Sequence, residues 1–339
     1  MKGPVSEVIF VPAGRMGGLS EALRAFDLKG FVGEEVPIKL HMGERGNKWY
    51  VDPGIVKSIC DELSRAGAEP FLFDTLPCYE GGRDTKEKYL ETARINGFGG
   101  LGYPIVIGND GTNVELGGHA FEVAEELYRS KSIVGISHAK GHTITALGAT
   151  IKNFGMGGLS NRSKGYIHDG GKPVIDRGEC DLCGTCEGLC PSDETNGERA
   201  LRVGEDWSID YDACLGCGRC VRGCPRGALA YRVDDFNKLL ALGAKACLVG
   251  KEALYINVAL KITKYCDCAV NALPIICEDV GILISKDPVA VDAASVDLIE
   301  GGMGRPFREV FGVDAMDHIR FAERIGLGST VYELIRISH

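Results

Sequence analysis

The sequence lacks several features that would place it in a specialised class of protein. Its 38 lysines and arginines are outnumbered by 47 aspartates and glutamates, which gives a net charge of −9. Nucleic acid is bound by a basic face, so this balance argues against nucleic acid as the main partner. No stretch approaches the roughly 18 apolar residues of a membrane span, and the apolar run near the N-terminus is too short for a signal peptide. These absences predict a cytoplasmic protein without a membrane span.

Cysteine and glycine, by contrast, are abundant. The chain has 14 cysteines and 47 glycines among its 339 residues. Glycine at this level favours many tight turns and close backbone approaches. In an exported protein the cysteines would suggest disulfides, but nothing in the sequence predicts export, so their spacing has to be considered.

Eight of the cysteines lie in two copies of one motif, C-x2-C-x2-C-x3-C-P. The first copy is "CDLCGTCEGLCP" and the second, "CLGCGRCVRGCP", follows it with every cysteine 34 residues further on. This spacing is the bacterial ferredoxin pattern, in which the fourth cysteine of each run binds the other cluster. The predicted ligands of one [4Fe–4S] cluster are therefore Cys180, Cys183, Cys186 and Cys224, and those of the other are Cys214, Cys217, Cys220 and Cys190.

A pair of structural zinc sites is the alternative interpretation of these cysteines. Zinc needs two C-x2-C pairs, but it does not need a third cysteine at the same spacing or a fourth that precedes proline. Because both copies carry these additional features, the motif favours iron–sulfur clusters. Gly184, Gly216 and Gly218 permit the tight turns that three closely spaced thiolates around one cluster require.

The regions on either side of the repeat predict an α/β fold. Strand-like apolar runs occur at 7–11, 36–40, 70–75, 104–108, 132–136, 254–262, 274–285 and 331–337. Helical patterns separate them at 19–26, 52–67, 84–97, 120–129, 234–242 and 287–302. This alternation predicts a parallel or mostly parallel, helix-covered sheet, interrupted by a small ferredoxin-like domain. The expected domains are 1–176 and 234–339 for the two parts of the α/β domain, and 177–233 for the insert.

Several helices carry recognisable start signals. Asp52 before Pro53 predicts a cap at the start of one helix, and Asp287 before Pro288 repeats the arrangement. Asp84 and Glu87 have the spacing of a capping box.

A glycine-rich stretch, "SHAKGHTITALGATIKNFGMGG", follows the strand predicted at 132–136. Ligands of open α/β sheets gather at the carboxyl ends of the strands, so His138, Lys140 and His142 are candidate catalytic residues. If this loop forms a helical turn, the two histidines lie on one face and suit two metal ligands.

The second half of the same stretch predicts an anion or phosphate site. Lys152 would supply a cation, and Asn153 with Gly155 and Gly157 would supply polar and backbone N–H groups. His168, between this stretch and the first cluster cysteine, is a further candidate for binding a cofactor.

Two further cysteines, Cys266 and Cys268, follow a strand-like run. In an extended chain they would point to the same side, and metal binding, redox chemistry and simple packing are all open for them. Cys60, Cys78, Cys247 and Cys277 lie in apolar or helical surroundings and are expected to be buried as small hydrophobic residues.

The stretches "SHAKGH…IKNFGMGG", "CDC" and "DVGILISKDPVAVDAASVDLI" resemble the iron–sulfur-centre proteins of domain of unknown function 362. The resemblance covers nearly the whole chain, including the cysteine repeat. It implies two [4Fe–4S] clusters on the eight cysteines, and a shared site formed by His138, His142, Lys152, Cys266 and Cys268. It implies no substrate.

Three functions remain open from the sequence. The first is an oxidoreductase that moves low-potential electrons through two clusters to the α/β domain, where a flavin, a further metal ion or a small anionic substrate would bind. The second is an electron carrier or assembly subunit whose acidic surface docks to a redox partner protein. The third is a metal-dependent racemase or lyase, with a metal held by His138, His142, Cys266 and Cys268.

Overall fold

The computed structural model describes residues 5–337, and this part of the chain divides into two compact units. The first unit contains the residues up to Ser163 and those from Leu240 onward, and the second contains Lys164–Leu239. All eight cysteines of the repeat belong to the second unit. This unit begins before and ends after the range 177–233, and the domain boundaries expected from the sequence stay a prediction.

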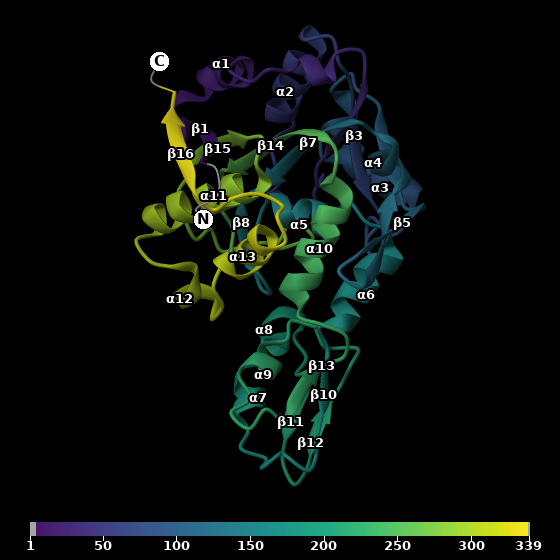
Figure 1. The fold of residues 1–339 in the computed structure, drawn as a ribbon, viewed down its shortest axis with the longest axis vertical. Coiled ribbons are helices and arrows are strands. Elements are labelled where there is room, and N and C mark those ends of the chain that lie inside the picture. Colours follow the sequence, from purple (N-terminus) through teal and green to yellow (C-terminus); the bar gives the residue numbers. More distant parts are fainter. Residues whose placement is uncertain (1–4, 338–339) are drawn as a thin grey trace. The chain divides into compact units, whose positions relative to one another are not determined.

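The first unit is built on an eight-stranded sheet with the order β16-β1-β15-β14-β7-β2-β3-β4 (Figure 1). Only β15 runs antiparallel to its two neighbours, and the other adjacent pairs are parallel. The mostly parallel α/β fold predicted from the sequence is therefore confirmed. The strands are β1 (Ser6–Pro12), β2 (Glu35–Lys39), β3 (Glu69–Thr75), β4 (Ile105–Gly108), β7 (Ser132–His138), β14 (Glu252–Ala259), β15 (Gly281–Ser285) and β16 (Tyr332–Arg336).

Helices cover both faces of this sheet (Figure 1). On one face, apolar side chains of α1, α2 and α3 join those of the strands in one continuous core. On the other face, Phe154 of α5 packs against Gly135 and Tyr255 of the strands, beside the long helix α11. The helices of the first unit are α1 (Leu19–Arg24), α2 (Pro53–Arg65), α3 (Lys86–Ile95), α4 (Glu125–Arg129), α5 (Thr150–Gly155), α11 (Pro288–Met303), α12 (Phe307–Phe311) and α13 (Met316–Arg324). Two more helices, α6 (Asn161–Gly170) and α10 (Phe236–Leu248), have residues in both units.

Two hairpins lie outside the sheet, formed by β5 (Gly111–Leu116) with β6 (His119–Ala124) and by β8 (Lys140–His142) with β9 (Ala146–Gly148). The second unit contains short elements: β10 (Pro173–Ile175), α7 (Thr185–Gly188), α8 (Ser192–Asn196), β11 (Leu201–Val203), β12 (Trp207–Ile209), α9 (Arg219–Arg222) and β13 (Leu229–Tyr231). No helix in residues 5–337 is both long enough and apolar enough to cross a membrane.

The helix expected over 120–129 is wrong in its first half. Residues up to Ala124 form β6, and only Glu125–Arg129 are helical. Phe121 and Val123 are buried whereas Ala120 is exposed, so the apolar residues alternate with the period of two that a strand requires. This short alternation next to helix-forming glutamates is easily taken for part of a helix.

The helix start signals are confirmed in two of three cases. Asp52 accepts a hydrogen bond from the Gly54 N–H, and Asp287 caps α11 in the same way. The capping box at Asp84 is wrong, because α3 begins one residue later, where the Thr85 hydroxyl accepts from the Lys88 N–H at 3.2 Å.

A buried carboxylate on α11 connects this helix to α5. Asp292 accepts hydrogen bonds of 2.8 Å from the backbone N–H groups of Thr150 and Ile151, at the start of α5, and from the Asn257 amide of β14. Burial raises the pKa of Asp292 to about 6, so at neutral pH the carboxylate is ionised and accepts from all three donors. Asp292 thereby fixes the start of α5, which carries Lys152 and Asn153.

We expect Asp292→Ala to lower the free energy of unfolding by about 3 kcal/mol, because it leaves the two buried backbone N–H groups of Thr150 and Ile151 without their acceptor. Urea unfolding of the oxygen-free protein, followed by circular dichroism, measures this change. Glu309→Ala, at an exposed position of α12, is the matched control and should leave the transition unchanged. Equal transitions for both variants would contradict the role given to Asp292.

Candidate functional site

In the second unit, the two cysteine loops repeat each other in conformation as well as in sequence. Leu182 and Gly184 of the first loop have φ values of 57° and 74°, and Gly216 and Gly218 at the equivalent positions of the second have 67° and 66°. Left-handed backbone at two places per loop turns the chain around a common centre, which is what closely spaced ligands to one cluster need.

The two loops differ at the first of these positions for a steric reason. A Cβ atom at Gly216 would lie 1.8 Å from the backbone oxygen of His168, so only glycine fits there. Leu182 occupies the same conformation in the first loop with a side chain, which costs about 1 kcal/mol or more of backbone strain. The cluster loop therefore imposes its backbone shape even where the residue is unsuited to it.

Each predicted set of four cysteines lines one cavity. The first cavity is bordered by Cys180, Cys183, Cys186 and Cys224. The second is bordered by Cys190, Cys214, Cys217 and Cys220. The fourth cysteine of each run thus lies with the first three of the other run, as the ferredoxin pattern requires. Four thiols around each cavity are a donor set that fits a [4Fe–4S] cluster.

Burial of these thiols is consistent with metal ligation. Burial raises the pKa of Cys186, Cys214 and Cys217 above that of an ordinary cysteine. A buried thiolate is therefore unfavourable at these positions unless positive charge lies beside it, and iron in a cluster supplies such charge.

His168 lies in the second unit, apart from the lysines and Asn153 with which the sequence grouped it. Its Nδ1–H donates to the Leu215 carbonyl at 3.0 Å, and its ring packs against Phe236. These contacts place His168 beside the second cysteine loop, so its position is explained without a cofactor phosphate.

In the first unit, charged side chains gather at the carboxyl ends of adjacent parallel strands. Lys39 ends β2, Asp74 lies near the end of β3, and His138 ends β7. The Lys39 Nζ contacts Asp74 Oδ1 at 2.8 Å and donates to Asn153 Oδ1 at 2.7 Å. All of these groups are buried or nearly so, and each charge therefore has a partner.

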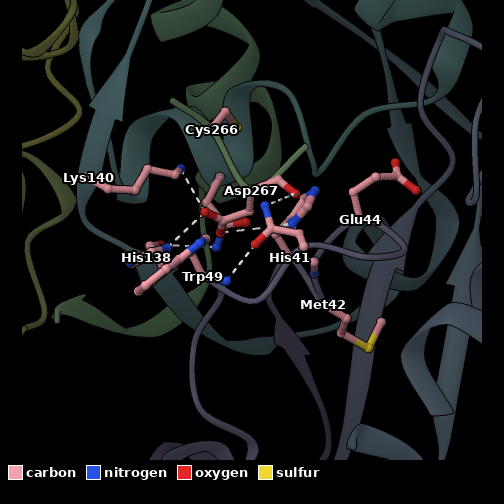
Figure 2. Close-up of polar contacts among 12 residues, drawn as sticks. His41, Met42, Glu44, Trp49, His138, Lys140, Cys266 and Asp267 are labelled. Carbon is pink, nitrogen blue, oxygen red and sulfur yellow. Dashed lines mark hydrogen bonds and ion pairs between the residues drawn. The ribbon is translucent and has the colours of Figure 1, made fainter. Parts of the chain in front are cut away.

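Asp267, in the loop after β14, is the centre of a second charged group (Figure 2). Its Oδ1 accepts a hydrogen bond of 2.8 Å from His138 Nδ1 and lies 4.0 Å from Lys140 Nζ. Figure 2 shows both side chains pointing toward this carboxylate. Burial alone would raise the pKa of Asp267, but His138 and Lys140 outweigh it and hold the pKa below its ordinary value. Asp267 is therefore an anion at neutral pH.

His138 uses both ring nitrogens in hydrogen bonds to oxygen. Nδ1 donates to Asp267, and Nε2 donates to the Leu260 carbonyl at 2.8 Å. A carboxylate and a carbonyl are both acceptors, so only the protonated ring satisfies both. With both nitrogens occupied in this way, His138 is not placed to bind a metal ion.

The helical turn considered for His138–His142 is wrong, because Lys140–His142 form strand β8 of a hairpin. His142 pairs with Ala146 across this hairpin, and its Nδ1 lies 2.9 Å from the Thr145 hydroxyl. Gly141 is required for close packing here, since a Cβ atom would lie 2.4 Å from the Lys264 carbonyl oxygen. His138 and His142 therefore belong to two different strands, β7 and β8, and not to one face of a helix.

Cys266 is surrounded by positive charge. Lys152 Nζ lies 3.5 Å from its Sγ, and Lys140 hydrogen-bonds to the same sulfur. A hydrogen bond from Cys268, together with Lys140 and Lys152, holds the pKa of Cys266 well below that of an ordinary thiol despite its burial. The pKa of Cys268 is correspondingly raised well above its ordinary value. Lys140 and Lys152 thus lie beside Cys266. The resemblance placed Lys152, Cys266 and Cys268 in one site without Lys140, and the catalytic role of these residues stays a prediction.

Asn153, Gly155 and Gly157 have structural contacts that explain them. The Asn153 amide donates to the Lys39 carbonyl, the Ile136 carbonyl and the Ser137 hydroxyl. A Cβ atom at Gly155 would lie 2.3 Å from the Leu240 carbonyl oxygen, and one at Gly157 would lie 2.4 Å from Lys39 Nζ. The two glycines lie at the C-terminal end of α5, where a helix presents carbonyl groups rather than N–H groups. These contacts explain the three residues without a bound anion, and the anion site stays a prediction.

Sequence reasoning missed two polar groups of this site, Asp267 and His41. His41 lies after β2, and its Nδ1 accepts from the Gly43 N–H at 3.1 Å and lies 4.0 Å from Asp267 Oδ2. Within the described part of the chain, neither His41 Nε2 nor Asp267 Oδ2 has a hydrogen-bond partner. The position of Asp267 between two cysteines was a sequence feature from which its place in this site could have been predicted.

The four remaining cysteines fit the expectation of burial with one exception. Cys60, Cys247 and Cys277 are buried, whereas Cys78 is exposed. Cys78 lies in the loop after β3, outside the elements whose apolar faces bury the others. The prediction that Cys78 is buried is therefore wrong.

Comparison with known proteins gives one family and several partial relatives. The family model described as domain of unknown function DUF362 matches residues 36–297. Pyruvate synthase subunit PorD of Methanothermobacter marburgensis is 32% identical over 84 residues, which are 25% of this chain and 90% of that protein. An iron–sulfur subunit of the CoB–CoM heterodisulfide reductase of Methanocaldococcus jannaschii is 32% identical over 89 residues, 22% of this chain but only 14% of that protein.

A solved structure of a protein from Thermotoga maritima is similar to this structure, and the similar region covers 85% of this chain and 58% of that chain. The sequence identity is 10% and the TM-score is 0.42.

We expect Lys152→Met to raise the pKa of Cys266, because it removes one of the two cations beside the thiolate. In the wild type, alkylation of Cys266 by iodoacetamide should persist as the pH falls below 9, since its pKa lies well below that value. In the variant, the pH at which the alkylation rate is half of its maximum should be higher by about one unit, which corresponds to about 1.4 kcal/mol of lost thiolate stabilisation. Peptide mass spectrometry measures the rate, and Lys57→Met on the exposed face of α2 is the control. An unchanged rate would mean that Lys152 does not stabilise the thiolate.

Proposed function

The chain belongs to the DUF362 family, and from this membership and the two cysteine-lined cavities we propose that it is an iron–sulfur oxidoreductase. Two [4Fe–4S] clusters in the second unit would pass low-potential electrons to the site around Asp267 and Cys266 in the first unit. The substrate is a small molecule with anionic character.

The observation that carries this proposal is the grouping of the cysteines. Cys224 lies with the first run and Cys190 lies with the second, so each cavity has four thiols from two loops. A bound [4Fe–4S] cluster supplies one-electron transfer at a potential that its surroundings set. The ferredoxin-type relatives support clusters of this kind, and the number of two rests on the two cavities.

The first-unit site has the groups that an anionic substrate needs. Lys140 and Lys152 provide two cations near Cys266, although Asp267 neutralises part of their charge. The unpartnered Asp267 Oδ2 and His41 Nε2 provide a polar acceptor and a polar donor, which a substrate or water can satisfy. Because burial strengthens electrostatic interactions, these groups would hold a substrate in a fixed orientation. A flavin or a further metal ion at this site remains part of the proposal.

A non-enzymatic electron carrier is the second candidate. It is favoured by the match to 90% of subunit PorD, a protein whose name makes it part of a larger enzyme. In this case a redox partner protein would bind the acidic chain, whose net charge is −9, through a basic patch. The buried charges of the first unit favour the oxidoreductase, since a carrier has no need for them.

The content of the protein purified without oxygen separates the two candidates. Iron, sulfide, other metals and any small molecule released on denaturation would be measured. A flavin, an extra metal or a bound small anion supports the oxidoreductase, whereas clusters alone support the carrier.

The crossed grouping of the cysteines predicts different outcomes for two double variants. Cys183→Ser/Cys224→Ser changes two ligands of one cavity, so one cluster and about half of the roughly eight iron atoms should survive. Cys183→Ser/Cys190→Ser changes one ligand in each cavity, so both clusters should be lost or converted. Iron analysis and electron paramagnetic resonance of the reduced proteins measure the outcome.

The single variants Cys183→Ser and Cys224→Ser serve as controls and should resemble each other. If Cys183→Ser/Cys190→Ser were the variant that retained one intact cluster, each run would bind its own cluster and the assignment would be wrong.

A further inference from the structure

The two cysteines of the first-unit site lie in a tight turn, which corrects the extended arrangement expected from the sequence. The Ala269 N–H donates to the Cys266 carbonyl at 2.9 Å, so residues 266–269 close a turn with Asp267 and Cys268 at its centre. An extended chain would separate the Cα atoms of residues two apart by roughly 7 Å. The turn brings the two side chains together, and the Cys268 S–H hydrogen-bonds to Cys266.

The two sulfur atoms differ in burial and in hydrogen bonding. Cys266 is buried and contacts Lys152 at 3.5 Å, whereas Cys268 is partly exposed and acts as its hydrogen-bond donor. One sulfur is therefore a thiolate and its neighbour is a thiol. A low-pKa thiolate beside a protonated thiol is the arrangement in which a disulfide forms and is reduced most readily.

The turn is held in place from several directions. The Asp267 carbonyl accepts from the Glu44 N–H at 3.0 Å, and the Asn47 amide donates to the Ala269 carbonyl at 2.6 Å. The Asp267 carboxylate is fixed by His138 on the opposite side. These bonds use the backbone and the acid between the cysteines, and none of them involves either sulfur atom.

Other buried cysteines of the first unit lack this environment. Burial raises the pKa of Cys60 to about 12, and burial also raises that of Cys277, whose Sγ contacts the Ile299 carbonyl. Cys277 is close to the pair in sequence, but its surroundings keep it a thiol. It is therefore an internal reference for the chemistry of the pair.

We propose that Cys266 and Cys268 form a dithiol–disulfide couple that stores two electrons in the first unit. Oxidation joins the Cys266 thiolate and the Cys268 thiol through one S–S bond and releases two electrons and one proton. Reduction consumes the same two electrons and one proton and restores thiolate and thiol. The electrons are exchanged with one-electron centres acting twice, or with a disulfide acting once. The couple rests on the proposed function, to which it adds a two-electron stage between one-electron transfer and the substrate.

The couple is tested by equilibrating the oxygen-free protein with mixtures of reduced and oxidised dithiothreitol, followed by alkylation and tryptic digestion. The peptide 265–286 contains Cys266, Cys268 and Cys277. In reducing mixtures all three should be alkylated. In oxidising mixtures one alkyl group should remain, on Cys277, and the peptide should otherwise be lighter by two hydrogen atoms.

Three variants make the result specific. Cys268→Ser should carry two alkyl groups in every mixture, and Cys277→Ser should show the same transition as the wild type. Lys152→Met removes a cation that stabilises the reduced form of the pair. In this variant, the ratio of reduced to oxidised dithiothreitol at which half of the pair is oxidised should rise at least tenfold, which means a more reducing couple. A peptide that keeps three alkyl groups in all mixtures, or a disulfide that includes Cys277, would overturn the couple.

Electron paramagnetic resonance of the same samples keeps this test separate from that of the proposed function. Intact clusters without the thiol transition would overturn the couple alone. A thiol transition in a protein that contains no clusters would overturn the proposed function and leave the couple standing.

Discussion

The buried carboxylate of Asp267 is the group on which the first-unit site depends. It is almost fully buried, and a charge in that position is tolerated only with partners of opposite sign. His138 and Lys140 provide them, from the end of β7 and from β8. Removing one partner of such a buried pair costs about 3–5 kcal/mol, because the other charge is then left alone. The position of the cysteine turn therefore follows from the need to neutralise the acid inside it.

The sheet explains why so many charges meet at one place. Parallel strands end at the same edge, and Lys39, Asp74 and His138 lie at or near the ends of three of them. The pairing Lys39–Asp74 neutralises one pair of charges at this edge, and His138–Asp267 neutralises another. Lys152 has a different role, since its Nζ contacts the Cys266 sulfur at 3.5 Å. Cations thus exceed the carboxylates at this edge, and a thiolate takes up part of the difference.

The second unit follows a different principle, in which a local motif dictates the structure. The cysteine loops have the same left-handed positions, even where one of them is occupied by Leu182 rather than glycine. Because each loop contributes three cysteines to one cavity and its fourth to the other, neither cavity is complete without both loops. The repeat is therefore one folding and binding unit, although each motif is recognisable alone.

The sequence by itself determined the features that depend on local pattern. The spacing of the cysteines predicted which four of them line each cavity, and strand-like apolar runs between helical patterns predicted the α/β sheet. Both patterns act over a few neighbouring positions. The prediction of a helix over 120–129 was partly wrong, because the alternating segment there is short and is followed directly by good helix formers. Only the tertiary structure decided that His138 bonds Asp267, 129 residues away, and that Asp292 caps α5 from α11. These contacts join segments distant in the chain, and their partners are chosen by the packing of buried charges, which no local pattern encodes.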